Sequence, residues 1–83
     1  MTENNKKYLL IVNVRTSNGL SSDVFYFDTP TDAEIEFYAK VSVAIQDKDI
    51  ILAHYIVVNE YGVKLDNLEK IIDNQKLENI IDA

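Results

Sequence analysis

Few side chains in this 83-residue sequence have the types and spacing that catalysis or metal binding requires. The chain has one histidine and no cysteine, which excludes the usual nucleophilic triads and the common zinc sites. His54 also lies inside the most hydrophobic run, residues 50–58, where we expect a neutral imidazole with one hydrogen bond and a structural role. The sequence therefore predicts no catalytic residues, no cofactor and no metal site.

Carboxylates are the remaining candidates for chemistry. Carboxylate catalysis needs acids that converge in a cleft and have shifted pKa values. Here the relevant aspartates lie at expected strand ends or helix starts, where turn and capping roles explain them: Asp23, Asp28, Asp32, Asp47 and Asp49. Residues 47–49 lack the spacing of a calcium loop, and a domain of this size has little depth for a ligand pocket. We therefore disfavour an enzyme or a small-ligand binder.

The net charge of −6 is unevenly distributed along the chain. Residues 1–22 contain Lys6, Lys7 and Arg15 against Glu3, a charge of +2, so the remainder carries −8. Binding to nucleic acid depends on clustered Lys and Arg, so direct nucleic-acid binding is disfavoured and a basic protein surface fits better. The alternative interpretation is that the charge only keeps a small domain soluble.

The five tyrosines and three phenylalanines are the most informative residues for binding, because Tyr is enriched in interface hot spots. Tyr61 lies in an expected turn, where a large ring has little core to enter, and it is our candidate for an exposed contact. Exposed strand edges offer a second route to partners through their unpaired backbone groups.

The first half of the chain predicts a β-hairpin followed by a capped helix. Residues 7–16 alternate between two faces, one with Tyr8, Leu10, Val12 and Val14 and the other with Leu9, Ile11, Asn13 and Arg15. Asn18-Gly19 favours a tight turn, and residues 20–28 form the return strand. Thr29 with Pro30 then predicts a helix N-terminus, although Thr31 with Glu34 offers a competing capping box.

The predicted helix has one apolar stripe that should face the sheet. Its members recur at spacings of three and four: Ala33, Phe37, Val41, Ala44 and Ile45. Glu36 and Lys40 can pair across one turn on the outside. Ile35 and Val43 lie off the stripe and are expected at the surface.

The second half predicts a second hairpin and a second helix. Residues 49–58 are nearly continuously apolar, which is typical of a central strand covered on both faces. A turn at residues 59–62 leads to a short edge strand over 63–65. Asp66 and Glu69 then have capping-box spacing and predict a helix with a Leu68, Ile71 and Ile72 stripe. Beyond Asn74 either a short helical turn or a strand-like extension is compatible with the pattern.

These elements predict an α+β fold in one small domain over residues 1–83, with a mostly antiparallel sheet, the order β-β-α-β-β-α and the helices on one face. We expect disorder over residues 1–6 and leave the tail, 76–83, unassigned. The absence of cysteine, together with a polar N-terminus without an apolar core behind it, indicates a cytoplasmic protein that does not enter membranes.

A small acidic α+β chain of this composition, rich in Asn, Ile, Lys and Asp, resembles the small host-takeover or anti-defence proteins of phages and mobile elements, anti-CRISPR inhibitors among them. Size, charge and β-β-α order carry the resemblance, and no residue motif does. It implies a non-enzymatic inhibitor that occludes a surface on a larger, basic partner, such as a nucleic-acid-binding protein. Its acids would compete with nucleic acid for a basic groove: Asp23, Asp28, Asp32, Glu34 and Glu36.

Self-association is the alternative hypothesis. In it a homodimer forms through exposed edge strands or through the C-terminal apolar segment, which contains Leu77, Ile80 and Ile81.

Overall fold

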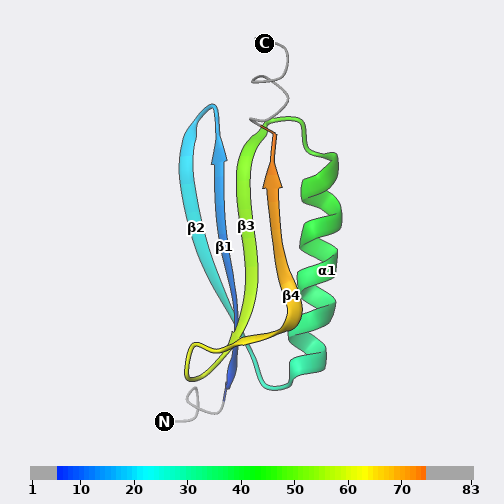
Figure 1. Cartoon of the computed structure of the whole chain (residues 1–83). Coiled ribbons are helices and arrows are strands. Elements are labelled where there is room, and N and C mark those ends of the chain that lie inside the picture. The colour runs from blue at the N-terminus through cyan, green and yellow to red at the C-terminus, as the bar shows by residue number, and fades with distance from the viewer. Residues whose placement is uncertain (1–5, 75–83) are drawn as a thin grey trace.

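One helix packs on one face of a four-stranded antiparallel sheet in the computed structural model, which describes residues 6–74 apart from the side chain of Asp66. The elements are β1 (Tyr8–Thr16), β2 (Gly19–Phe27), α1 (Pro30–Gln46), β3 (Ile50–Asn59) and β4 (Lys64–Asp73). The sheet order is β2-β1-β3-β4, so β1 and β3 are central and β2 and β4 form the edges (Figure 1). The predicted α+β class with a mostly antiparallel sheet is confirmed.

The β1–β2 hairpin follows the predicted alternation. Thr16 lies opposite Gly19, and the register continues to Tyr8 opposite Phe27. Gly19 has a φ of 124°, which side chains with a Cβ rarely adopt and which allows the chain to reverse after two loop residues. Leu10 and Val12 consequently face the helix, whereas Leu9 and Ile11 face the other side of the sheet.

Thr29 caps the helix. Its Oγ1 accepts a hydrogen bond from the backbone N of Asp32 at 3.2 Å, and Pro30 occupies the first helical position. The alternative cap at Thr31 is therefore not used. The exposure of Ile35 and Val43 is confirmed, but Ile45 is 60% exposed rather than part of the apolar stripe. Ile45 follows Ala44 by one residue, a rotation of about 100° that takes its side chain away from the sheet.

The core lies between α1 and the inner face of the sheet. Ala33, Phe37, Val41 and Ala44 of the helix are buried against residues from all four strands. The expectation that β3 is covered on both faces is wrong for the described residues. Ala53, Tyr55 and Val57 are buried under the helix. On the opposite side Leu52, His54 and Ile56 are only half-buried, and Val58 alone is buried.

The predicted second helix is wrong over residues 66–73, where the chain continues as strand β4. Leu68, Ile71 and Ile72 have helical spacing, yet Ile72 is buried and Ile71 is 59% exposed, because neighbouring residues of a strand point to opposite faces. The free edge of β3 supplies the hydrogen-bond partners that make the strand the better solution. The order in the described residues is therefore β-β-α-β-β, and the unassigned tail, 76–83, lies outside them.

Candidate protein-binding groove

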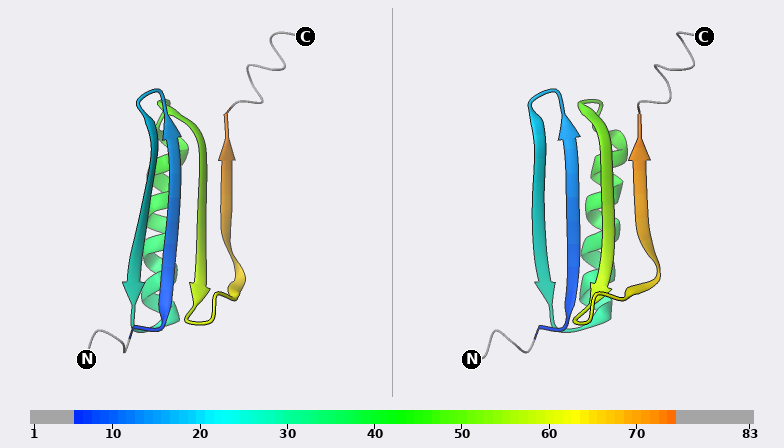
Figure 2. Two further views of the ribbon diagram at one scale, coloured as in Figure 1. Left: turned by 90° about the vertical axis from the view of Figure 1, so that its left-hand side faces the viewer. Right: turned by 60° about the vertical axis from the view of Figure 1, so that its left-hand side comes forward.

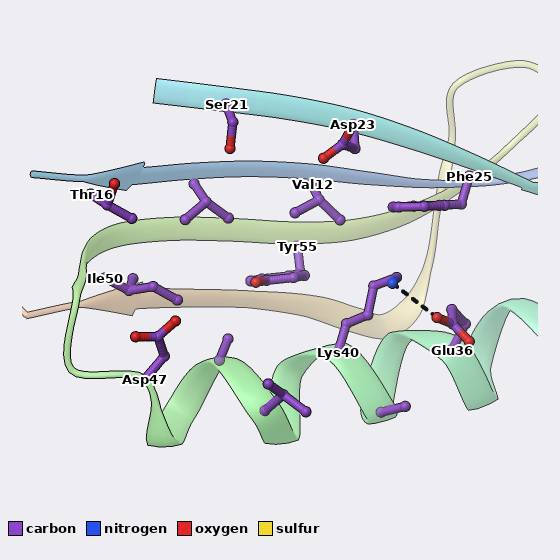
Figure 3. Close-up of a pocket in the computed structure, with 14 residues that line it drawn as sticks. Val12, Thr16, Ser21, Asp23, Phe25, Glu36, Lys40, Asp47, Ile50 and Tyr55 are labelled. Atoms are coloured by element: carbon purple, nitrogen blue, oxygen red, sulfur yellow. Dashed lines mark ion pairs between the residues drawn. The ribbon is translucent and has the colours of Figure 1, made fainter. Parts of the chain in front are cut away.

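A groove of about 500 Å³ runs between α1 and the inner face of the β1–β2 hairpin (Figure 3). Its volume lies within the range of about 300–1,000 Å³ that ligand sites occupy, although it is an open groove and not an enclosed cavity. Its walls and floor come from all parts of the fold except β4. They are formed by Val12, Val14, Thr16, Ser21, Asp23, Phe25, Glu36, Ala39, Lys40, Val43, Ala44, Asp47, Ile50 and Tyr55.

The groove exists because the inner face of β2 has small and polar side chains along its first half. Ser21 and Asp23 lie opposite Val14 and Val12 of β1, and every residue from Gly19 through Val24 is exposed. Large apolar side chains at these positions would draw the helix over β2. Phe25, farther along the strand, packs against the core and closes that end of the groove floor.

Three carboxylates and one ammonium group line the groove. Asp23 extends from the β2 side, while Glu36 and Asp47 come from the helix and the residue that follows it (Figure 3). Nζ of Lys40 lies 3.0 Å from Oε2 of Glu36, as predicted for this pair, and 4.3 Å from the centroid of the Phe25 ring. The groove therefore has a net charge of −2, and its single cation is already paired.

Tyr55 forms the middle of the floor and is 5% exposed (Figure 3). Burial, and next the negative charge of Asp47, raise the pKa of its phenol above the ordinary value of 10.0. Within residues 6–74 no hydrogen-bond partner of this hydroxyl is seen. At neutral pH the group is protonated and can donate a hydrogen bond to a ligand in the groove.

The structure brings together two of the predicted binding residues, Asp23 and Glu36, and separates them from the others. Asp28, Asp32 and Glu34 lie around the start of the helix, outside the groove. Oδ1 of Asp28 is 3.7 Å from Nζ of Lys6. Asp32 lies in the first helical turn, where its negative charge interacts favourably with the helix dipole.

Tyr61 lies in the β3–β4 turn, at the same end of the molecule as the start of the helix (Figure 1). Its side chain is 81% exposed, and its backbone N donates to Oδ1 of Asn59 at 2.8 Å. The residue is thus available to a partner, but it does not belong to the groove, and its role in binding stays a prediction.

Asp47, Lys40 and Tyr55 are groove residues that sequence reasoning did not select for binding. Asp47 does have the turn role expected of it, since its Oδ1 accepts from the backbone N of Asp49 at 2.9 Å. A signal was nevertheless present, because residues 36, 40 and 43 of the helix and residue 47 just after it are spaced by four, three and four and so lie along one stripe. That stripe lies beside the buried one and forms the helical wall of the groove.

A second polar cluster lies on the side of the sheet away from the helix. Nε2 of His54 is 2.7 Å from Oε2 of Glu69, whose Oε1 is 3.2 Å from Nζ of Lys64. The hydrogen bond from His54, followed by that from Lys64, lowers the pKa of Glu69 below its ordinary value of 4.5. An ionised carboxylate only accepts hydrogen bonds, so Nε2 carries the proton. His54 has its expected hydrogen bond, but outside the core.

Comparison with protein-family models, with curated proteins and with solved structures found no match. Within residues 6–74 no three His, Asp or Glu side chains gather where they could hold a metal ion. In the same range the helix is too short and too polar to cross a membrane.

Proposed function

We propose that this protein is a non-enzymatic protein-binding module that occludes a basic segment of a larger partner by binding it in the groove. The observation that carries the proposal is the groove's lining, where Asp23, Glu36 and Asp47 surround an apolar floor and the one cation is paired within the wall. A surface of this kind attracts positive charge and buries apolar atoms at the same time.

Lysine and arginine side chains have the chemistry that this lining complements. Their aliphatic stems can pack on Val12, Val14 and Tyr55, while their charged ends reach carboxylates at the rim. The carboxylates repel phosphate, which disfavours nucleic acid as the occupant. An anti-defence inhibitor that competes with nucleic acid for a basic protein surface would be one form of such a module.

The experiment measures binding of a fluorescently labelled peptide of alternating Lys and Leu, whose side chains supply both kinds of contact. The double variant Asp23→Asn/Asp47→Asn removes two groove charges and keeps the side-chain shapes. We expect its affinity to fall about tenfold, the sum of two partly exposed ion pairs of ~0.5–1 kcal/mol each. Affinity of the unaltered protein should also fall as ionic strength rises from about 0.05 to about 0.3 M.

The matched control is Glu34→Gln/Glu60→Gln, which makes the same change in net charge at exposed positions outside the groove. Its affinity should stay close to that of the unaltered protein. Equal losses in both double variants would show that net charge alone attracts the peptide. Binding that does not respond to Asp23→Asn/Asp47→Asn would contradict the proposed site.

A further inference from the structure

The two edge strands of the sheet differ in how they are protected against pairing with another chain. β4 contains two lysines and three acids, and its register with β3 shifts between Ile56 and Val58. Charged side chains, lysine above all, and such irregularities discourage pairing at a sheet edge. β2 has one charged residue, Asp23, and neither lysine nor proline, and it keeps a single register with β1 over nine pairs. Its outer edge is therefore suited to pairing with a further strand.

The backbone groups on this outer edge belong to alternate residues of β2. The backbone N of Asn74 donates to the carbonyl of Ile51, so odd-numbered residues of β3 bond to β4 and even-numbered ones to β1, because bonding directions alternate along an antiparallel strand. The register carries this alternation across β1 to β2. The outward N–H and C=O groups are consequently those of Leu20, Ser22, Val24 and Tyr26. No part of residues 6–74 pairs with them (Figure 2).

The side chains on the two sides of this edge differ in chemistry. Ser21 and Asp23 line the groove, which has a net charge of −2. The side chains of Leu20, Val24 and Tyr26 point away from the helix and are 43–63% exposed. An added strand would place its own side chains alternately on these two sides. A residue opposite Asp23 would face the groove with its Cβ about 5 Å from the Cβ of Asp23.

We propose that the partner's basic segment binds as a fifth strand, antiparallel to β2 along its outer edge. Every second residue of the segment is Lys or Arg and faces the groove, and the residues between them are apolar. The proposal rests on the proposed function, because it takes the groove as the site of the basic side chains. Backbone hydrogen bonds to the edge supply affinity, as in other cases of strand addition, and antiparallel pairing is slightly more stable per residue than parallel pairing.

Charge favours such a segment over a second copy of this chain at the same edge. Two copies joined through β2 around a two-fold axis perpendicular to the sheet would bring both Asp23 carboxylates to the groove side of the joined edge. Like charges on paired strands are destabilising, and each chain has a net charge of −6. A basic strand instead brings opposite charges together.

The test uses the unaltered protein and two N-methylated forms of the labelled Lys-Leu peptide. In the antiparallel arrangement, residues whose side chains point away from the groove direct their N–H groups to β2, and these residues are the leucines. The peptide methylated on the backbone N of two leucines should bind at least about tenfold more weakly than the unmethylated peptide. The peptide methylated on two lysines should bind nearly as well as the unmethylated one. Both peptides have the same composition and charge, so a difference reports the direction of the N–H groups.

Three variants test the same edge from the side of the protein. Ser22→Pro removes an outward N–H that β1 does not use, and proline is tolerated at such positions of edge strands. It should bind the unmethylated peptide about fivefold more weakly or worse. Ser22→Ala keeps the N–H and removes only the hydroxyl that donates to Oδ1 of Asn13, and Ile71→Pro changes the outer edge of β4. Both should bind like the unaltered protein, and circular dichroism checks the folding of all three.

The outcomes separate the fifth strand from the proposed function. Equal affinities for the two methylated peptides, or a larger loss with the lysine-methylated one, would overturn the fifth strand even where Asp23→Asn/Asp47→Asn still weakens binding. The proposed function fails separately, when that double variant has no effect. Dimerisation of the unaltered protein that Ser22→Pro abolishes, measured by sedimentation equilibrium, would assign the edge to a second copy and would also overturn the proposal. The peptide comparison needs no variant, so it decides the question if Ser22→Pro does not fold.

Discussion

Nζ of Lys40 lies 4.3 Å from the centroid of the Phe25 ring, so the only cation in the groove wall is held between the helix and the edge strand. The contact is a cation–π interaction. Together with the Glu36 ion pair at 3.0 Å, it occupies the ammonium group, and the carboxylates of Asp23 and Asp47 are left to attract a ligand.

Replacement of Lys40 should therefore strengthen binding of a basic ligand. Lys40→Gln changes the groove charge from −2 to −3 and frees Glu36, and we expect affinity for the Lys-Leu peptide to rise about threefold, consistent with one exposed ion pair. Fluorescence titration measures the change. Lys7→Gln alters the net charge equally at an exposed site outside the groove and should have little effect. Weaker binding by Lys40→Gln would show that the ammonium group itself takes part in recognition.

The contacts of Glu69 with His54 and Lys64 predict that the stability of the fold decreases in acid. Because the folded-state pKa of Glu69 is lowered from 4.5, its ionised form stabilises the fold above pH 4.5, and this contribution is lost as pH falls through the folded-state pKa. Glu69→Gln should therefore be less stable than the unaltered protein at pH 7, and the two should converge in acid. Urea unfolding across pH 3–7 tests this, with Glu34→Gln as the control. A constant difference at every pH would contradict it.

For Tyr55 we expect the stability of the fold to decrease at alkaline pH. Its pKa is raised above 10.0 by burial and by Asp47, so the neutral phenol favours folding below pH 10 and this contribution disappears as pH rises through the folded-state pKa. Tyr55→Phe keeps the ring in the core and removes the ionisable group. Thermal unfolding followed by circular dichroism should show equal melting at pH 7 within a few degrees, and higher melting for the variant above pH 10. Tyr61→Phe, at an exposed turn position, should follow the unaltered protein.

The elements that sequence predicts well here are those whose signals are local. Gly19 after Asn18 reverses the chain, and Thr29 with Pro30 begins the helix, because each residue acts on its immediate neighbours through backbone conformation or a hydrogen bond. The stretch around Leu68 failed for the converse reason. Its local spacing suits a helix, but β3 offers a free edge along which six of its residues pair in register with β4, and that information lies elsewhere in the chain.

The candidate groove was only partly predictable. The acids at residues 23 and 36 could be chosen from charge, and the helical wall from its spacing. Their meeting across one groove depends on where the helix crosses the sheet, which small side chains on β2 decide. The apolar run of β3 was read correctly as a central strand, but not as one covered on both faces, because the described residues bury mainly the face under the helix.

Gly19 also determines which face of the sheet each side chain of β2 points to. Strand β2 carries Asp23 toward the groove and Val24 toward the side of the sheet away from the helix, so an acidic and an apolar side chain stand at neighbouring positions. A slip of one position in the hairpin would exchange them, placing acid among the apolar residues and apolar side chains in the groove. The positive φ of a single glycine thus fixes which face of the sheet carries Asp23 and which carries Val24.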